Sequence, residues 1–206
     1  MKRKLLAFAI IIFVCSKGFG QDKGNVEYGV GVGIGSSTVS DGDGNTNSSD
    51  RTVFNAGISG DYYFSNRWSL KAKLQYDQKG WNNGYLNDLN SGNSYIENYH
   101  LNYLSVPVMA NWHFGATRNW YLNFGPYIGF LLSAKTSPDN YDVKPLFHTV
   151  DGGIAFGVGV KIPLSNQVKF FIEMDGQGSA ANIVKTTDGS SLNNSRGSFN
   201  IGINFL

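Results

Sequence analysis

The sequence predicts an all-β fold, namely an eight-stranded antiparallel up-and-down transmembrane β-barrel. Eight stretches of up to 15 residues alternate apolar with polar or small side chains, as strands with two different faces require. Long and short connections alternate between them, which is typical of outer-membrane barrels. The apolar faces lack charged residues, because Arg or Lys at the bilayer midplane costs roughly 2–4 kcal/mol. A soluble β-sandwich also alternates, but its strands are usually about 5–6 residues long.

The N-terminus has the pattern of an export signal. Three basic residues precede an apolar run over residues 5–14, and Gly18 and Gly20 supply small residues before Gln21. This pattern predicts a secretory signal peptide over residues 1–20, cleaved before Gln21, and a barrel domain over residues 21–206. Removing the signal leaves 13 basic and 15 acidic side chains, a net charge of −2, and no cysteine. We therefore expect no nucleic-acid partner and no disulfide framework.

The first four strands are expected at residues 26–36, 52–64, 67–77 and 100–114. In the first strand, Val, Tyr and Ile alternate with glycine, and in the third, Trp, Leu and Tyr alternate with Ser, Lys and Gln. Polar segments at residues 37–51 and 78–99 are expected to be long loops, whereas Ser65 and Asn66 form a tight turn. Pro107 removes a backbone donor from the fourth strand, so a local bulge is expected there, and Pro126 is a similar interruption.

The last four strands follow the same alternation. The fifth is expected at residues 119–133, the sixth and seventh form a hairpin within residues 150–179 around a break at 163–166, and the eighth covers residues 196–206. Residues 134–149 and 178–195 are expected to be long loops, and residues 115–118 a short turn. Both termini then lie on the periplasmic side, and the long loops are extracellular.

Charged residues of the strands fall on the face opposite the apolar one. An eight-stranded barrel has an interior just wide enough for side chains, so these residues are expected to pair with one another and close the barrel as a plug. The predicted lumen charge network consists of Glu27, Asp61, Lys71, Lys73, Asp77, Asp151, Lys161, Lys169, Glu173 and Asp175.

Aromatic residues gather in two places. Those near the short turns predict a girdle at the periplasmic interface: Tyr62, Phe64, Trp68, Trp112, Phe114, Trp120 and Phe205. The long loop at residues 78–99 carries a second group, a candidate interaction surface: Trp81, Tyr85, Tyr95 and Tyr99. The alternative for this second group is a β-ribbon above the membrane whose aromatic side chains pack on each other.

Segments at residues 70–80, 103–110, 124–129 and 151–159 resemble the PorT-like outer-membrane β-barrel family of Bacteroidetes-type bacteria. The resemblance covers essentially the whole mature chain and implies an eight-stranded outer-membrane barrel. Some relatives are tied to protein secretion, and the family supplies no catalytic residues. One departure is the last residue, because these barrels often end on an aromatic residue whereas Leu206 follows Phe205 here.

No motif predicts a cofactor or a metal. The glycine string at residues 29–35 lies within a strand and no helix pattern follows it, which excludes a dinucleotide loop. Residues 41–47 resemble a calcium loop, but Thr46 stands where glycine is required and Thr52 where glutamate is required, which leaves at most weak calcium binding. His100, His113 and His148 lack the spacing of metal ligands.

The expected function is non-enzymatic: a structural or surface-interaction role through the extracellular loops, accessory to envelope assembly or protein secretion. The expected partners are outer-membrane lipid, lipopolysaccharide and an extracellular or envelope protein, and the barrel is expected to be monomeric. One alternative is a lipid A-modifying enzyme that uses a set such as Ser133, His148 and Asp151. A second alternative is a narrow small-solute channel.

Overall fold

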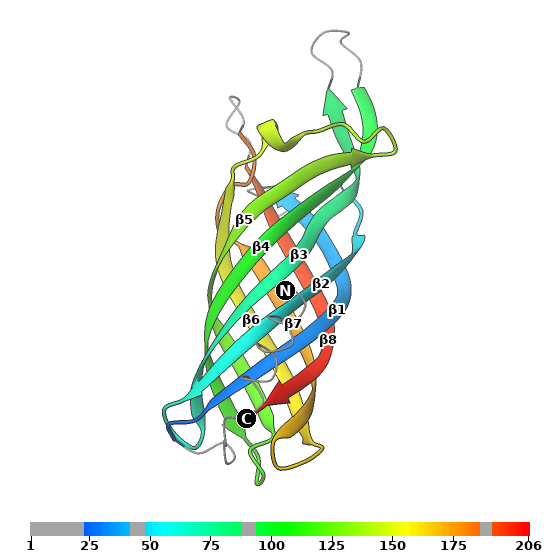
Figure 1. Ribbon diagram of the computed structural model, residues 1–206. Coiled ribbons are helices and arrows are strands. Elements are labelled where there is room, and N and C mark those ends of the chain that lie inside the picture. Colours follow the sequence, from blue (N-terminus) through cyan, green and yellow to red (C-terminus); the bar gives the residue numbers. More distant parts are fainter. Residues whose placement is uncertain (1–22, 42–47, 88–93, 186–190) are drawn as a thin grey trace, which may run out of the picture.

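The computed structural model describes residues 23–41, 48–87, 94–185 and 191–206. Their strands form one closed antiparallel barrel in chain order, in which β1 also pairs with β8 (Figure 1). The predicted eight-stranded barrel is therefore confirmed. The elements are β1 (Val26–Asp41), β2 (Arg51–Tyr63), β3 (Trp68–Asn87), β4 (Ser94–Phe114), β5 (Trp120–Ser137), the 3₁₀ helix η1 (Lys144–Leu146), β6 (Val150–Pro163), β7 (Val168–Ser179) and β8 (Leu192–Phe205).

Two predicted features lie outside the described residues. The signal peptide falls within residues 1–22, and most of the calcium-like loop falls within residues 42–47. Among the described residues, no helix is long and apolar enough to cross a membrane.

The two faces of the wall differ in chemistry. Outward side chains such as Val32, Ile58 and Phe156 are apolar and exposed, whereas inward side chains such as Glu27 and Asp61 are buried. Since successive side chains of a strand point to opposite faces, one alternating sequence produces both surfaces. The outward apolar side chains form a continuous band around the barrel, which we call the apolar band, and a surface of this extent requires contact with lipid.

The longest strands extend beyond the apolar band. β3 has 20 residues and β4 has 21, and their pairing continues from Gln78↔Asn102 to Asn87↔Ser94 (Figure 1). The prediction of a long loop was therefore wrong for residues 78–87 and 94–99, which form the β-ribbon of the alternative. A register shift between Trp81 and Gly84 breaks the alternation there, and above the membrane neither face has to be apolar.

The expected bulge at Pro107 is also absent. Pro107 pairs with Tyr127 in the same register as Ala110 with Phe124, so the ladder passes the proline without an inserted residue. The register shift between β4 and β5 lies instead between Asn102 and Tyr103, nearer the end of the barrel that carries the long connections. Pro107 lacks a backbone donor, but losing that donor does not by itself require an inserted residue.

Inward glycines make room for large side chains from other strands. A Cβ atom added at Gly31 would lie 2.7 Å from the Phe171 ring, and one added at Gly159 would lie 2.5 Å from Tyr121. Gly80 is required for a different reason, because its φ of +121° favours glycine and an added Cβ would lie 2.0 Å from the carbonyl oxygen of Tyr99.

Candidate functional site

The lumen is filled by ionic side chains in equal numbers of each sign. Among the described residues, six cations and six anions form nine ion pairs, and none of these side chains is more than 10% exposed. All ten residues of the predicted lumen charge network belong to this set. The two that sequence reasoning missed are Lys79 and Arg196. The paired charges cancel, as a low-dielectric interior requires.

The part of the network nearest the short turns is centred on Lys161 of β6. Its ammonium group pairs with Glu27 of β1 and lies 3.1 Å from Asp61 of β2. The same group donates a hydrogen bond of 2.9 Å to the Tyr63 hydroxyl. Lys169 of β7 lies 2.8 Å from the second oxygen of Glu27. Four strands are thus connected through side chains that meet across the lumen.

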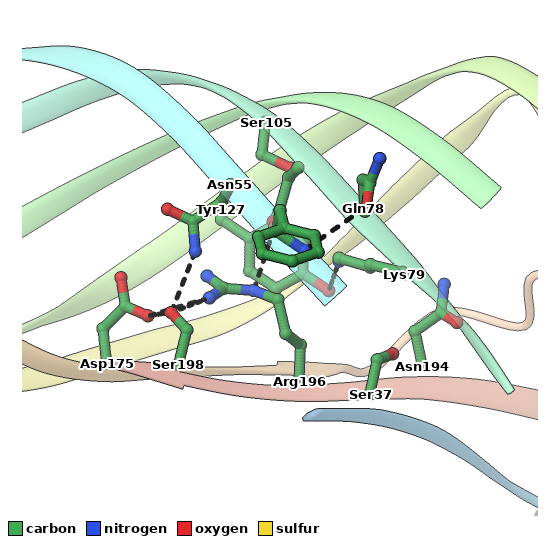
Figure 2. A network of polar contacts seen from close by, with 12 residues as sticks. Ser37, Asn55, Gln78, Lys79, Ser105, Tyr127, Asp175, Asn194, Arg196 and Ser198 are labelled. Atoms are coloured by element: carbon green, nitrogen blue, oxygen red, sulfur yellow. Dashed lines mark hydrogen bonds and ion pairs between the residues drawn. The ribbon is translucent and has the colours of Figure 1, made fainter. Parts of the chain in front are cut away.

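The middle of the network is centred on two acidic residues of β7. Glu173 pairs with Lys71, at 3.0 Å, and with Lys73. Asp175 lies 3.2 Å from Lys73 and 2.9 Å from Arg196 of β8. Figure 2 shows the Arg196 guanidinium directed toward Asp175 and Ser198. Arg196 also pairs with Asp77 of β3 at 3.0 Å, so it joins opposite sides of the barrel.

The part of the network nearest the long connections surrounds Asp151 of β6. Lys79 lies 2.9 Å from its carboxylate, and the Ser179 hydroxyl donates a hydrogen bond of 2.6 Å to the other oxygen. Tyr127 also donates to this carboxylate, at 3.2 Å, and Figure 2 shows its ring beside Lys79. This group of buried polar side chains is the last polar layer before the mouth of the barrel.

An apolar cluster covers this polar layer. Trp81 and Tyr99 stack with ring centroids 4.6 Å apart, and Phe147 meets both rings edge-on. The β5–β6 and β7–β8 connections contribute side chains to the cluster, so loops and strands close the mouth together. We call this set the mouth cluster: Val39, Trp81, Tyr99, Leu101, Tyr103, Leu131, Ala134, Val143, Phe147, Ile183 and Val184.

The mouth cluster corrects the predicted interaction surface. Trp81 and Tyr99 are only 4% and 5% exposed, so neither is available to a partner. Tyr85 and Tyr95 are 66% and 46% exposed. The register shift after Trp81 accounts for part of this difference, because Tyr85 pairs with Ile96 on the outward face of the ribbon.

Little free volume is left between the lumen side chains. A cavity beside Lys73 and Gln75 has a volume of about 30 Å³, which is room for one or two water molecules. Several buried polar atoms nearby have no protein partner in the described structure, the Gln75 amide oxygen among them. Such atoms are the usual partners of internal water.

The residues of the enzymatic alternative are engaged separately. The Asp151 carboxylate is bound by Lys79 and Ser179, the Ser133 hydroxyl accepts a hydrogen bond of 2.9 Å from Asn102, and His148 is an exposed loop residue. The buried His113 ring is 2.9 Å from the Ser69 hydroxyl. Within the described ranges, no group of three or more His, Cys, Asp or Glu residues is arranged to hold a metal ion.

The residues of the predicted girdle lie near the short turns. Trp68 and Trp112 are directly paired across β3 and β4, with ring centroids 6.3 Å apart. Trp112 stacks with Phe114 at 5.0 Å, and Phe114 with Trp120 at 6.5 Å. The remaining members are Tyr62 and Phe64, which are exposed, and Phe205, which is half-buried.

Solved structures with a similar fold include outer-membrane proteins. The OprG protein of Pseudomonas aeruginosa is similar over 90% of this chain and 97% of its own, with 12% identity and a TM-score of 0.56. Neisserial surface protein A is similar over 92% of this chain and 99% of its own, with 14% identity and a TM-score of 0.48. Ail of Yersinia pestis is similar over 89% of this chain and 99% of its own, with 15% identity and a TM-score of 0.42. Comparison with curated proteins gives no match.

The family comparison covers most of the sequence. Residues 19–179 match the family described as outer membrane protein beta-barrel domain. The closed eight-stranded barrel and its apolar band agree with this match. The chain therefore belongs to the outer membrane protein beta-barrel domain family, which implies the outer membrane of a Gram-negative bacterium as its location.

Proposed function

We propose that the protein is a non-enzymatic, non-conducting barrel that anchors the β3–β4 ribbon at the cell surface for contact with a protein partner. The observation that carries this proposal is the filling of the lumen. Three layers of paired side chains and the mouth cluster succeed one another from the periplasmic to the extracellular end. An ion that entered would have to separate buried salt bridges and displace packed aromatic rings.

The ribbon supports a role in partner binding. Tyr85 and Ile96 are direct cross-strand partners, are 66% and 62% exposed, and lie beyond the apolar band. Lipid covers the apolar side chains of the band, but water surrounds this pair. Exposed aromatic and aliphatic side chains on a projecting element are typical of protein-binding surfaces.

Two measurements test the proposal. In planar bilayers, the refolded barrel is expected to show no stable open level, and a steady conductance would favour the small-solute channel. In cells, a photo-crosslinker at Tyr85 is expected to capture one partner protein. The matched control is a crosslinker at Leu164, which is exposed on a short turn at the other end. Equal products from both positions, or none from Tyr85, would contradict the proposed surface.

We also infer that the chain is exported with cleavage before Gln21 and that its partner belongs to an envelope-assembly or secretion machine, a role to which some members of the PorT-like family are tied. Intact-mass measurement of the membrane form tests the cleavage site. Comparison of secreted proteins between wild-type and deletion strains tests the secretion role. The lipid A-modifying alternative predicts altered lipid A in the deletion strain, and we expect its mass spectrum to be unchanged.

A further inference from the structure

Basic side chains gather at the end of the barrel wall, where the apolar band ends. Phe130 and Leu132 are the last exposed apolar residues of β5 at this level. Directly beyond them lies a group that we call the rim cluster: Arg51, His100, Lys135 and Lys144. In an outer-membrane barrel this level corresponds to the headgroups of the outer leaflet.

Pairing and hydrogen bonds connect Arg51, His100 and Lys135, and a separate hydrogen bond holds Lys144 at the same edge. His100 of β4 is the direct cross-strand partner of Lys135 of β5. The Arg51 guanidinium lies 3.0 Å from Nδ1 of His100 and donates a second bond of 2.9 Å to the carbonyl oxygen of Lys79. The Lys144 ammonium group donates a hydrogen bond of 2.9 Å to the carbonyl oxygen of Leu132, the residue that marks the edge of the apolar band.

The cations of the rim cluster differ from those of the lumen. Every lumen cation has a carboxylate partner, and all nine ion pairs of the described residues are in the lumen. Among the residues that the structure describes, no carboxylate oxygen lies within 4.0 Å of the charged nitrogens of Arg51, Lys135 or Lys144. Asp142 bridges to Lys135 through the backbone, and its carboxylate accepts the backbone N–H of Lys144. The cluster therefore retains a net positive charge.

His100 contributes a hydrogen-bond donor to this group. A guanidinium can only donate, so Nδ1 of His100 accepts from Arg51 and the ring proton is on Nε2. Burial and the charge of Arg51 lower the pKa of His100, which lies beyond the membrane-spanning part of β4, so the ring is neutral at pH 7. Nε2 then supplies a neutral donor to the cluster.

We propose that the rim cluster binds a phosphate group of an outer-leaflet glycolipid, the phosphorylated lipid A portion of lipopolysaccharide. Arginine and lysine are the residues that bind phosphate, and each cation near an anionic membrane surface contributes about 1 kcal/mol, or roughly fivefold in affinity. The site lies beside the hydrocarbon, so the acyl chains of the same molecule can cover the adjacent apolar band. This inference relies on the extracellular orientation of the long loops in the proposed function.

The test compares lipids that differ only in phosphate. The full mature protein is refolded in detergent, and native mass spectrometry measures binding of phosphorylated and dephosphorylated lipid A. We expect the phosphorylated form to bind more tightly, by about tenfold or more. The double variant Arg51→Gln with Lys135→Gln is expected to lose most of this preference, and Asp142→Asn to strengthen it. Heat-modifiable migration on gels confirms that each variant is folded.

The matched control removes a cation at the other end of the barrel. Arg118 lies in a short turn, where it bonds the carbonyl oxygen of Asn66, and Arg118→Gln is expected to leave lipid A binding unchanged. Equal binding of both lipid forms, or equal losses in the double variant and in Arg118→Gln, would overturn the site. Displacement of lipid A by millimolar inorganic phosphate would reassign the cluster to free phosphate. Bilayer conductance is measured separately, so failure of the non-conducting role is distinguishable from failure of the site.

Discussion

The lumen and the mouth of the barrel are both filled, but by opposite chemistries. In the lumen, charged side chains from strands that are fixed by backbone ladders pair across the interior. At the mouth, apolar side chains from loops pack on aromatic residues of the strands. Loss of one partner should leave an uncompensated buried charge in the lumen, whereas truncation at the mouth should leave only a cavity that loops can close. The lumen should therefore dominate stability, and the mouth should control access.

The largest effect is expected from Lys161→Met. This change leaves Asp61 and one oxygen of Glu27 without their cation, and removing one partner of a buried pair costs about 3–5 kcal/mol. Urea unfolding of the barrel in lipid vesicles, followed by tryptophan fluorescence, measures the loss. Adding Asp61→Asn should recover part of it, because Glu27 and Lys169 then remain as a balanced pair. If the double variant is no more stable than Lys161→Met alone, buried charge is not what the lumen must compensate.

A smaller effect is expected from Ile183→Ala in the mouth cluster. Ile183 is fully buried, but it belongs to the β7–β8 connection, which can relax into the space. We expect a loss of about 2 kcal/mol, the low end for such a truncation, with faster amide exchange in the two loops. Conductance should stay absent, since the polar layers below are intact. Leu164→Ala, at an exposed turn position, is the control. An open pore in Ile183→Ala would show that the mouth alone seals the barrel.

A third effect distinguishes the inside of the wall from the outside. A Cβ atom at Gly35 would lie 1.9 Å from the carbonyl oxygen of Gly197, whereas one at Gly60 would meet nothing within 4 Å. Gly35→Ala is expected to cost about 1–3 kcal/mol through overpacking, and Gly60→Ala less than about 0.5 kcal/mol. Urea midpoints of the two variants provide the comparison. Equal urea midpoints for Gly35→Ala and Gly60→Ala would contradict this expectation. They would mean that the strands shift to accommodate the added inward methyl group without loss of stability.

The alternation of side chains predicts the faces of the strands but not their partners. The parity that places Lys71 and Asp77 in the lumen also applies to Lys79 and Arg196. The polar sequence around Lys79 predicts a loop, however, and Arg196 is the first residue of its predicted strand, where the face is least defined. The pairing itself was not predictable. Lys161 meets Glu27, 134 residues away, because the tilt and stagger of the closed barrel bring β6 and β1 side chains to one level.

The ribbon shows where sequence reasoning failed and why. Above the bilayer no hydrocarbon selects for apolar residues, so the alternation that marks β3 and β4 lower down disappears. The register shift between Trp81 and Gly84 then changes which residues face inward. Aromatic composition alone therefore grouped two buried rings with the exposed Tyr85. Only the three-dimensional register separates the mouth cluster from the outward surface of the ribbon.

The smallest effect on stability is expected from Tyr85→Ala, which separates the outward face of the ribbon from the mouth cluster. Tyr85 is 66% exposed, so its truncation should change the free energy of unfolding by less than about 0.5 kcal/mol. With the photo-crosslinker moved to Ile96, the cross-strand partner of Tyr85, loss of partner capture should be large, because an exposed aromatic residue contributes contact area only when a partner covers it. Leu146→Ala, on the exposed surface of η1, is the matched control and should leave capture unchanged. If the folded Tyr85→Ala variant still captured the partner, Tyr85 would not be part of the interaction surface, and the partner would have to bind elsewhere.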